Sequence, residues 1–146
     1  TVFDKLDASL AKAVVSIGAV KGVEIGDGFE ASKSHGSSNN DAFTCQNGPV
    51  IKKTNHAGGI LGGMSDGSEL IFRAAFKPTP SISKEQQTIN TAFEDTTIAI
   101  TGRHDPVVVP RAVVVVESMA AITILDQMMI NMSSKMDALE AFYCKE

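Results

Sequence analysis

The chain has 146 residues, 43% of them hydrophobic, which is enough to build the core of one domain. Its net charge of −4 and isoelectric point near 5.3 argue against non-specific nucleic-acid binding, which needs a positive surface. The sequence has only three arginines, so few side chains can hold an anionic ligand: Arg73, Arg103 and Arg111.

The first predicted element is an amphipathic helix near the N-terminus. Apolar residues recur there at helical spacing, and Gly18 follows as a natural stop: Phe3, Leu6, Leu10, Ala13, Val14 and Ile17. Such a helix is unlike a secretory signal peptide. Because the sequence begins at Thr1 with this helix already under way, we expect a piece of a longer protein.

Strand signals follow in the middle of the chain. Residues 19–31 alternate loosely around three glycines, which predicts a strand or a strand pair with close backbone approaches. Residues 32–48 are rich in Ser, Asn and Gly and predict a long surface loop. Residues 69–76 alternate and predict a strand that ends before Pro78, and a second strand is expected over 96–101.

The C-terminal third reads as helix. Pro110 occupies a favourable first helical position, and residues 111–132 are apolar all round, which predicts a helix sandwiched between layers. Its apolar run approaches membrane-spanning length, but Glu117 and Asp126 interrupt it, so a core helix is favoured over a membrane span. Ser133 or Ser134 is expected to cap a short final helix. These elements predict an α+β fold, with helices packed on a mostly antiparallel sheet.

Cys45 and Cys144 are far apart in sequence and have no metal-ligand spacing. Two free thiols of a cytosolic protein are the favoured interpretation.

Three stretches can carry chemistry. The segment 55–67 contains five glycines but matches neither a P-loop nor GxGxxG, so a structural turn and a ligand-approaching loop remain equally open. The stretch KPTPS pairs Lys77 with the hydroxyls of Thr79 and Ser81, which suits a phosphate, although an ordinary strand exit has the same composition.

The third stretch is the trio Arg103-His104-Asp105, just before the long helix. It reads as a solvated loop, as an ion-pair network, or as a site where arginine holds an anion and aspartate handles a proton. In an extended segment Arg103 and Asp105 point to one side and His104 to the other.

Four segments together resemble the C-terminal part of chorismate synthase, in order and in spacing, from about Phe3 to Met129. They are SIGAVKGVEIGDGF, NHAGGILGGMSDG, FKPTPSI and TGRHDPVVVPRAVVVVESMAAI. The resemblance implies a βαβ sandwich of mostly antiparallel sheets around a helical layer, here truncated, with residues 1–146 as the C-terminal portion of one domain. It implies a cytoplasmic homotetramer that binds neither nucleic acid nor membrane.

The family converts 5-enolpyruvylshikimate 3-phosphate to chorismate by anti-1,4-elimination of phosphate, in aromatic amino acid biosynthesis, and requires reduced FMN. Carried over by resemblance, the catalytic residue is Asp105, near the flavin. The cofactor contacts fall on Gly18, Ala19, Gly62, Lys77, Pro78, Thr79, Pro80, Ser81 and Arg103.

Two departures from the family pattern matter. Gly18 stands where members more often carry Asn, Gln or Pro, so only its backbone can make a contact. The family's N-terminal part, with two catalytic histidines and most substrate-binding arginines, has no counterpart here. We therefore expect about half of an active site and no turnover by this chain alone. The alternative is a catalytically inactive assembly domain that self-associates through exposed apolar surface.

Overall fold

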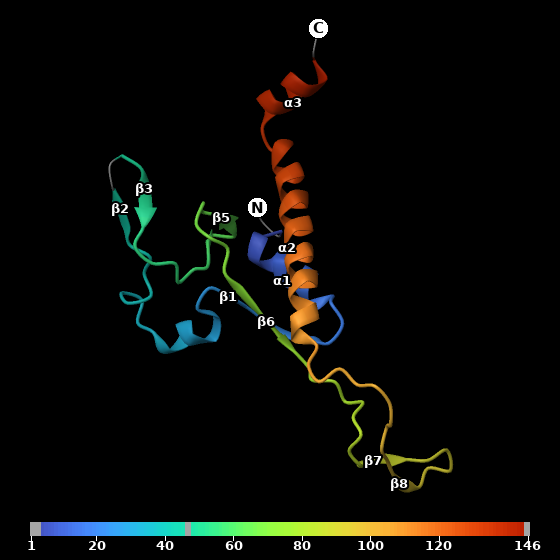
Figure 1. Cartoon of the computed structure of the whole chain (residues 1–146). Helices are drawn as coiled ribbons and strands as arrows, with labels where there is room; N and C mark the ends of the chain where they lie inside the picture. Colours follow the sequence, from blue (N-terminus) through green and yellow to red (C-terminus); the bar gives the residue numbers. More distant parts are fainter. Residues whose placement is uncertain (1–3, 46–47, 145–146) are drawn as a thin grey trace.

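The structure is a computed structural model that describes residues 4–45 and 48–144. Its centre contains two packed helices, α1 (Leu6–Val15) and α2 (Val109–Met132), and a two-stranded sheet of β1 (Val20–Ile25) and β6 (Phe72–Phe76). Two hairpins and the C-terminal helix extend from this centre in different directions (Figure 1). The architecture is therefore α+β and open.

Helix α1 confirms the predicted amphipathic helix. Leu6, Leu10 and Val14 share its buried face at a spacing of four residues. No side chain caps its N-terminus; instead, the Leu6 N–H donates a 2.8 Å hydrogen bond to the Gly63 carbonyl. Leu6 and Leu10 form the core cluster with Ile60 and Ala120. Phe3, also expected in this helix, lies outside the described residues.

The central sheet confirms two predicted strands. β1 and β6 pair antiparallel, with Val23 opposite Ala74. In β6 the side chains alternate in burial, as the sequence predicts. Phe72, Ala74 and Phe76 are half-buried, and Arg73 and Ala75 between them are exposed.

Three smaller antiparallel hairpins complete the strand set: β2 (Phe43–Cys45) with β3 (Val50–Lys52), β4 (Ile60–Leu61) with β5 (Met64–Ser65), and β7 (Gln86–Ile89) with β8 (Asp95–Ile98). The strand predicted over 96–101 is confirmed in part as β8, which ends at Ile98. Its partner β7 was missed because its polar residues show no apolar alternation. The loop predicted over 32–48 is wrong in part, since a 3₁₀ helix, Gly28–Lys33, reaches into it and β2 lies within it; Gln46 and Asn47 fall outside the described residues.

Helix α2 begins with Pro110 in its first turn, as predicted, and packs on α1. Only Ala112 and Ala120 of α2 are buried, so the expected enclosure between two layers is absent from the described part of the chain. This helix is long and apolar enough to cross a membrane by length and composition. The final helix α3 (Met136–Tyr143) follows Lys135, and no side chain caps it, so the predicted serine cap is wrong.

Candidate functional site

The pairing of β1 with β6 brings two predicted cofactor segments together. The Lys77 N–H donates a 2.7 Å hydrogen bond to the carbonyl oxygen of Ala19. Ala19 itself has a positive φ of 69°, an unusual conformation for a residue with a side chain. Gly18, just before it, is exposed with open space around it. The 18–19 turn and the start of the KPTPS loop therefore form one local surface.

The KPTPS loop itself, residues 77–81, is extended and open to solvent. Lys77 and Thr79 are exposed, and Ser81 is half-buried. The side-chain amide of Gln86, at the start of β7, donates a 3.0 Å hydrogen bond to the Pro80 carbonyl and ties the loop down. The loop thus offers a cation and hydroxyl groups on a braced backbone.

The Arg103-His104-Asp105 trio lies in the connection from β8 to α2, while the KPTPS loop belongs to the connection from β6 to β7 (Figure 1). Asp105 accepts a 2.8 Å hydrogen bond from the guanidinium of Arg111, in the first turn of α2. His104 Nε2 lies 2.8 Å from the Ile100 carbonyl oxygen. Arg103 is exposed. The trio therefore combines an exposed cation with an ion pair, and the arginine that holds Asp105 is Arg111.

The glycines of segment 55–67 differ in how closely they are packed. A Cβ on Gly58 would lie 2.5 Å from the Gly26 nitrogen, and one on Gly59 would lie 2.5 Å from the Glu69 carbonyl oxygen. These two glycines are required by backbone packing. Gly62 also has a positive φ, +61°, but its missing Cβ faces open space. Gly67 is open in the same way, whereas a Cβ on Gly63 would lie 2.6 Å from the Lys5 side chain, so the open space in this segment lies at Gly62 and Gly67.

Gly62 lies apart from the other predicted cofactor residues. Its neighbour Gly63 is hydrogen-bonded to Leu6 at the start of α1, whereas Gly18 follows the end of that helix. A helix of 10 residues spans about 15 Å. Within this chain Gly62 and the surface of Gly18, Ala19 and Lys77 thus lie near opposite ends of α1.

A buried polar cluster escaped the sequence analysis. The side chain of Lys52, at the end of β3, is 6% exposed and lies between the side-chain carboxylates of Asp41 and Asp66, which are 8% and 11% exposed. The Lys52 Nζ is 3.7 Å from Asp41 Oδ2 and donates a direct hydrogen bond to Asp66 Oδ2. Asp41 also accepts hydrogen bonds from the Thr54 hydroxyl and from the N–H groups of His56 and of the next residue.

These contacts keep both carboxylates ionised. Burial alone raises the pKa of Asp41, but the N–H groups of Ala57 and His56, the Thr54 hydroxyl and Lys52 outweigh it and lower the pKa to about 2. The hydrogen bond from Lys52 is the main cause that lowers the pKa of Asp66. No periodic pattern signals this cluster, because it joins residues of three separate segments.

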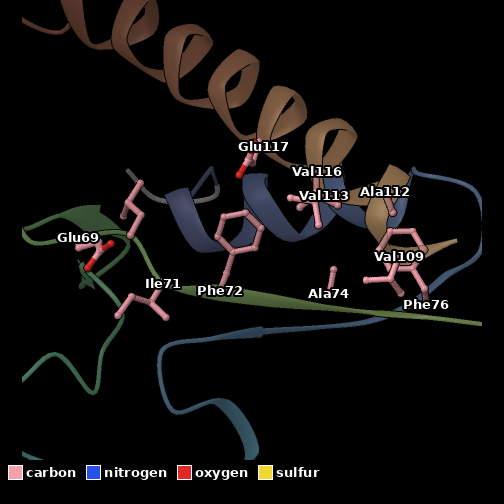
Figure 2. A pocket seen from close by; sticks show the side chains of 11 residues that line it. Glu69, Ile71, Phe72, Ala74, Phe76, Val109, Ala112, Val113, Val116 and Glu117 are labelled. Atoms are coloured by element: carbon pink, nitrogen blue, oxygen red, sulfur yellow. The ribbon is translucent and has the colours of Figure 1, made fainter. Parts of the chain in front are cut away.

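An apolar groove of about 440 Å³ runs between α2 and β6. In Figure 2, Phe72, Ala74 and Phe76 of β6 face Val109 and Val113 of α2. Glu69 and Glu117 also line it. In the described part of the chain, none of the predicted site residues borders this groove. Its lining suits apolar side chains and not an anionic cofactor.

Residues 1–129 match the family model of chorismate synthase. The chain belongs to the chorismate synthase family. The chorismate synthase of Agathobacter rectalis is 64% identical over 144 residues, which cover 99% of this chain and 39% of that enzyme. The chorismate synthase of Methanococcoides burtonii is 57% identical over 128 residues, covering 87% of this chain and 35% of that enzyme.

A crystal structure of chorismate synthase superposes on this chain with a TM-score of 0.67 at 31% identity, covering 94% of this chain and 34% of the solved one. The expected α+β fold with antiparallel sheets is thereby confirmed. The chain spans about two fifths of the length of the curated relatives it matches. The roles of the individual site residues stay predictions.

Proposed function

We propose that this chain supplies part of the active site of a chorismate synthase. The complete enzyme would convert 5-enolpyruvylshikimate 3-phosphate to chorismate and phosphate by anti-1,4-elimination with reduced FMN. Family membership carries the proposal, together with the hydrogen bond that joins Ala19 to Lys77 and makes one surface of two predicted cofactor segments. The activity is proposed for the complete enzyme, because this chain covers only part of its relatives.

Side chains of the KPTPS loop and of the 103–105 trio are suited to a reduced, anionic flavin. Lys77 and Arg103 are exposed cations, and Thr79 and Ser81 offer hydroxyl donors, which are the groups that hold anions in proteins. Bound reduced FMN would supply electron density to the substrate during loss of phosphate. Gly62 would let the chain come close to the cofactor.

Asp105 would hold or move a proton near the flavin, and Arg111 would orient its carboxylate through the 2.8 Å hydrogen bond. The chain's three arginines offer few bidentate partners for the phosphate and carboxylate groups of the substrate, so we expect further cations from the rest of the enzyme. We place the complete enzyme in the cytoplasm as a homotetramer that binds neither nucleic acid nor membrane, with α2 inside its protein core.

A chimaera tests this proposal. The 144-residue segment of the A. rectalis enzyme that matches this chain is replaced by this chain, and chorismate formation is followed anaerobically with reduced FMN. We expect turnover by the chimaera and none by the 146-residue chain alone. Asp105→Asn should lower kcat by about 100-fold or more, the usual contribution of a proton-transferring side chain. Asp95→Asn, at an exposed aspartate of β8, is the matched control.

Two outcomes would contradict the proposal. A folded chimaera that binds FMN and substrate but forms no chorismate would exclude the activity. Equal kcat values for Asp105→Asn and Asp95→Asn would remove Asp105 from the chemistry.

The second candidate function is self-association without catalysis. Large apolar side chains along α2 are exposed, among them Val114, Ile122, Leu125 and Met128. Exposed apolar surface of this kind drives association. Light scattering after size exclusion tests the idea: we expect defined oligomers of the chain, and a monomer at all concentrations would reject it.

A further inference from the structure

We propose that the buried cluster of Asp41, Lys52 and Asp66 positions Gly62 for cofactor binding. The inference rests on the proposed function, because it assigns a purpose to Gly62 only if a flavin approaches there. The three residues act through the backbone of the glycine-rich segment and are positioning residues, not catalytic ones.

The β4–β5 hairpin that carries Gly62 is short, and its two residue pairs define its register. Ile60 lies opposite Ser65 and Leu61 opposite Met64, which leaves Gly62 and Gly63 as a two-residue turn. Both glycines have positive φ, 61° and 84°, as a type I′ turn requires. A hairpin of only two residue pairs has little stability of its own, so its orientation depends on what holds its two ends.

The base of this hairpin is attached to the cluster through Asp66, which directly follows β5. The Asp66 N–H donates a 3.0 Å hydrogen bond to the Gly59 carbonyl and closes the hairpin. The Asp66 side chain meanwhile accepts a hydrogen bond from Lys52. Asn55 completes the base, since its Oδ1 accepts the Gly59 N–H at 2.8 Å.

Asp41 holds the chain on the other side of the same hairpin. Its carboxylate accepts the N–H groups of His56 and Ala57, the two residues that precede the first pair of glycines. Lys52, between Asp41 and Asp66, therefore links the entry of the glycine-rich segment to its exit. In Figure 1, β5 lies between the β2–β3 hairpin and α1.

The tip of the hairpin is fixed separately, by the bond from Leu6 to the Gly63 carbonyl. Gly62 thus lies between two anchors, with the cluster at the base and α1 at the tip, and its own Cβ position faces open space. Asp41, Lys52 and Asp66 are not members of the apolar core of Leu6, Leu10, Ile60 and Ala120. Its contacts go to the glycine-rich backbone, which is why we infer positioning and not general stability.

The test measures the Kd for FMN by fluorescence quenching on the chimaera defined above. Lys52→Met should raise the Kd by about tenfold or more, because small displacements of a binding group have large effects. Its kcat at saturating FMN should change much less than the Kd. Lys52→Arg keeps the charge and should restore most of the affinity. Lys53→Met, at the exposed neighbouring lysine, should bind FMN like the parent.

Native-state hydrogen exchange on the 146-residue chain supplies a readout that needs no flavin. Lys52→Met should accelerate exchange of the Gly59 and Asp66 amides while the Leu10 amide, in the core, keeps its protection. If Lys52→Met fails to fold, Asp66→Asn replaces it, because that variant retains the contact of Lys52 with Asp41.

The outcomes separate the two proposals. No FMN binding by the parent chimaera would overturn the proposed function. Binding by the parent with an unchanged Kd in Lys52→Met would overturn the positioning role alone. Equal acceleration of exchange at Gly59, Asp66 and Leu10 would also overturn it, since the cluster would then stabilise the whole fold.

Discussion

The Asp41–Lys52–Asp66 cluster finds its hydrogen-bond partners within this chain, whereas α2 leaves most of its apolar side chains exposed. The cluster draws its partners from residues 41–68, and no buried side-chain nitrogen or oxygen in the described part of the chain lacks a hydrogen bond. Of the 24 residues of α2, only Ala112 and Ala120 are buried. The two regions thus differ in how much of their environment this chain supplies.

The difference reflects two kinds of interaction. Hydrogen bonds and ion pairs are directional and are satisfied by a few atoms, so a short stretch of chain can complete them. Burial of apolar surface scales with area and needs whole elements on both sides. One packed layer, in which α1 contacts α2 and β1 and β1 pairs with β6, lies on one side of α2 and cannot cover the other.

The largest expected effect is in the packed layer. Leu10 is fully buried, and Leu10→Ala should lower the free energy of unfolding by about 4 kcal/mol, because it removes buried methyl groups and leaves a cavity. Val114→Ala, on the exposed face of α2, should change it by less than about 0.5 kcal/mol. Urea denaturation of both variants measures this contrast. A large loss in Val114→Ala would mean that a second copy covers this face.

The next largest effect on stability distinguishes Gly58 from Gly62 in the glycine-rich segment. Gly58→Ala places a methyl group 2.5 Å from the Gly26 nitrogen at a positive φ, so it should destabilise the fold by about 3 kcal/mol. In Gly62→Ala the added methyl group points into open space. We expect the free energy of unfolding to fall by only about 1 kcal/mol, because alanine disfavours the positive φ at this position. Thermal unfolding followed by circular dichroism compares them. Equal losses would show that the Gly62 turn is as tightly packed as Gly58.

Acid should weaken the polar cluster before the packed layer. The folded pKa of Asp41, about 2, lies below its ordinary value of 3.8, so the folded state binds this proton less readily than the unfolded state. The stabilisation is complete above the ordinary pKa and is lost as pH falls from about 4 toward 2. Asp41→Asn should therefore flatten the pH dependence of the urea midpoint in this window. Asp95→Asn serves as the control, and equal slopes for both variants would contradict the assignment.

Sequence patterns predicted the elements that local signals define. The spacing of Leu6, Leu10 and Val14 predicted α1, and Pro110 predicted the start of α2. β7 gave no signal because its residues, including Gln86, are mostly polar. The exposure of α2 had no signal either, because an all-round apolar helix looks the same whether or not a second layer is present.

The candidate site was less accessible to sequence reasoning than the fold. Resemblance selected both Ala19 and Lys77, but their contact depends on the register of β1 against β6, which no local pattern encodes. The trio at 103–105 was open to interpretation as a solvated loop, an ion-pair network or a site, and no pattern indicated that Asp105 would pair with Arg111 in the first turn of α2. Both contacts depend on how two segments are placed in space, which no periodic pattern in the sequence encodes.

The smallest expected effect concerns that ion pair. The side chains of Arg111 and Asp105 are 71% and 41% exposed, so solvent and salt screen their attraction. Arg111→Gln should therefore change the free energy of unfolding by less than about 1 kcal/mol, and less still at high salt.

In the chimaera, however, the same variant should lower kcat, because Asp105 loses the group that orients it. Unfolding curves and kcat measured on Arg111→Gln, with Arg73→Gln as the matched control, separate these roles. If kcat is unchanged while Asp105→Asn is inactive, Asp105 needs no orienting partner, and the exposed ion pair is only a surface contact.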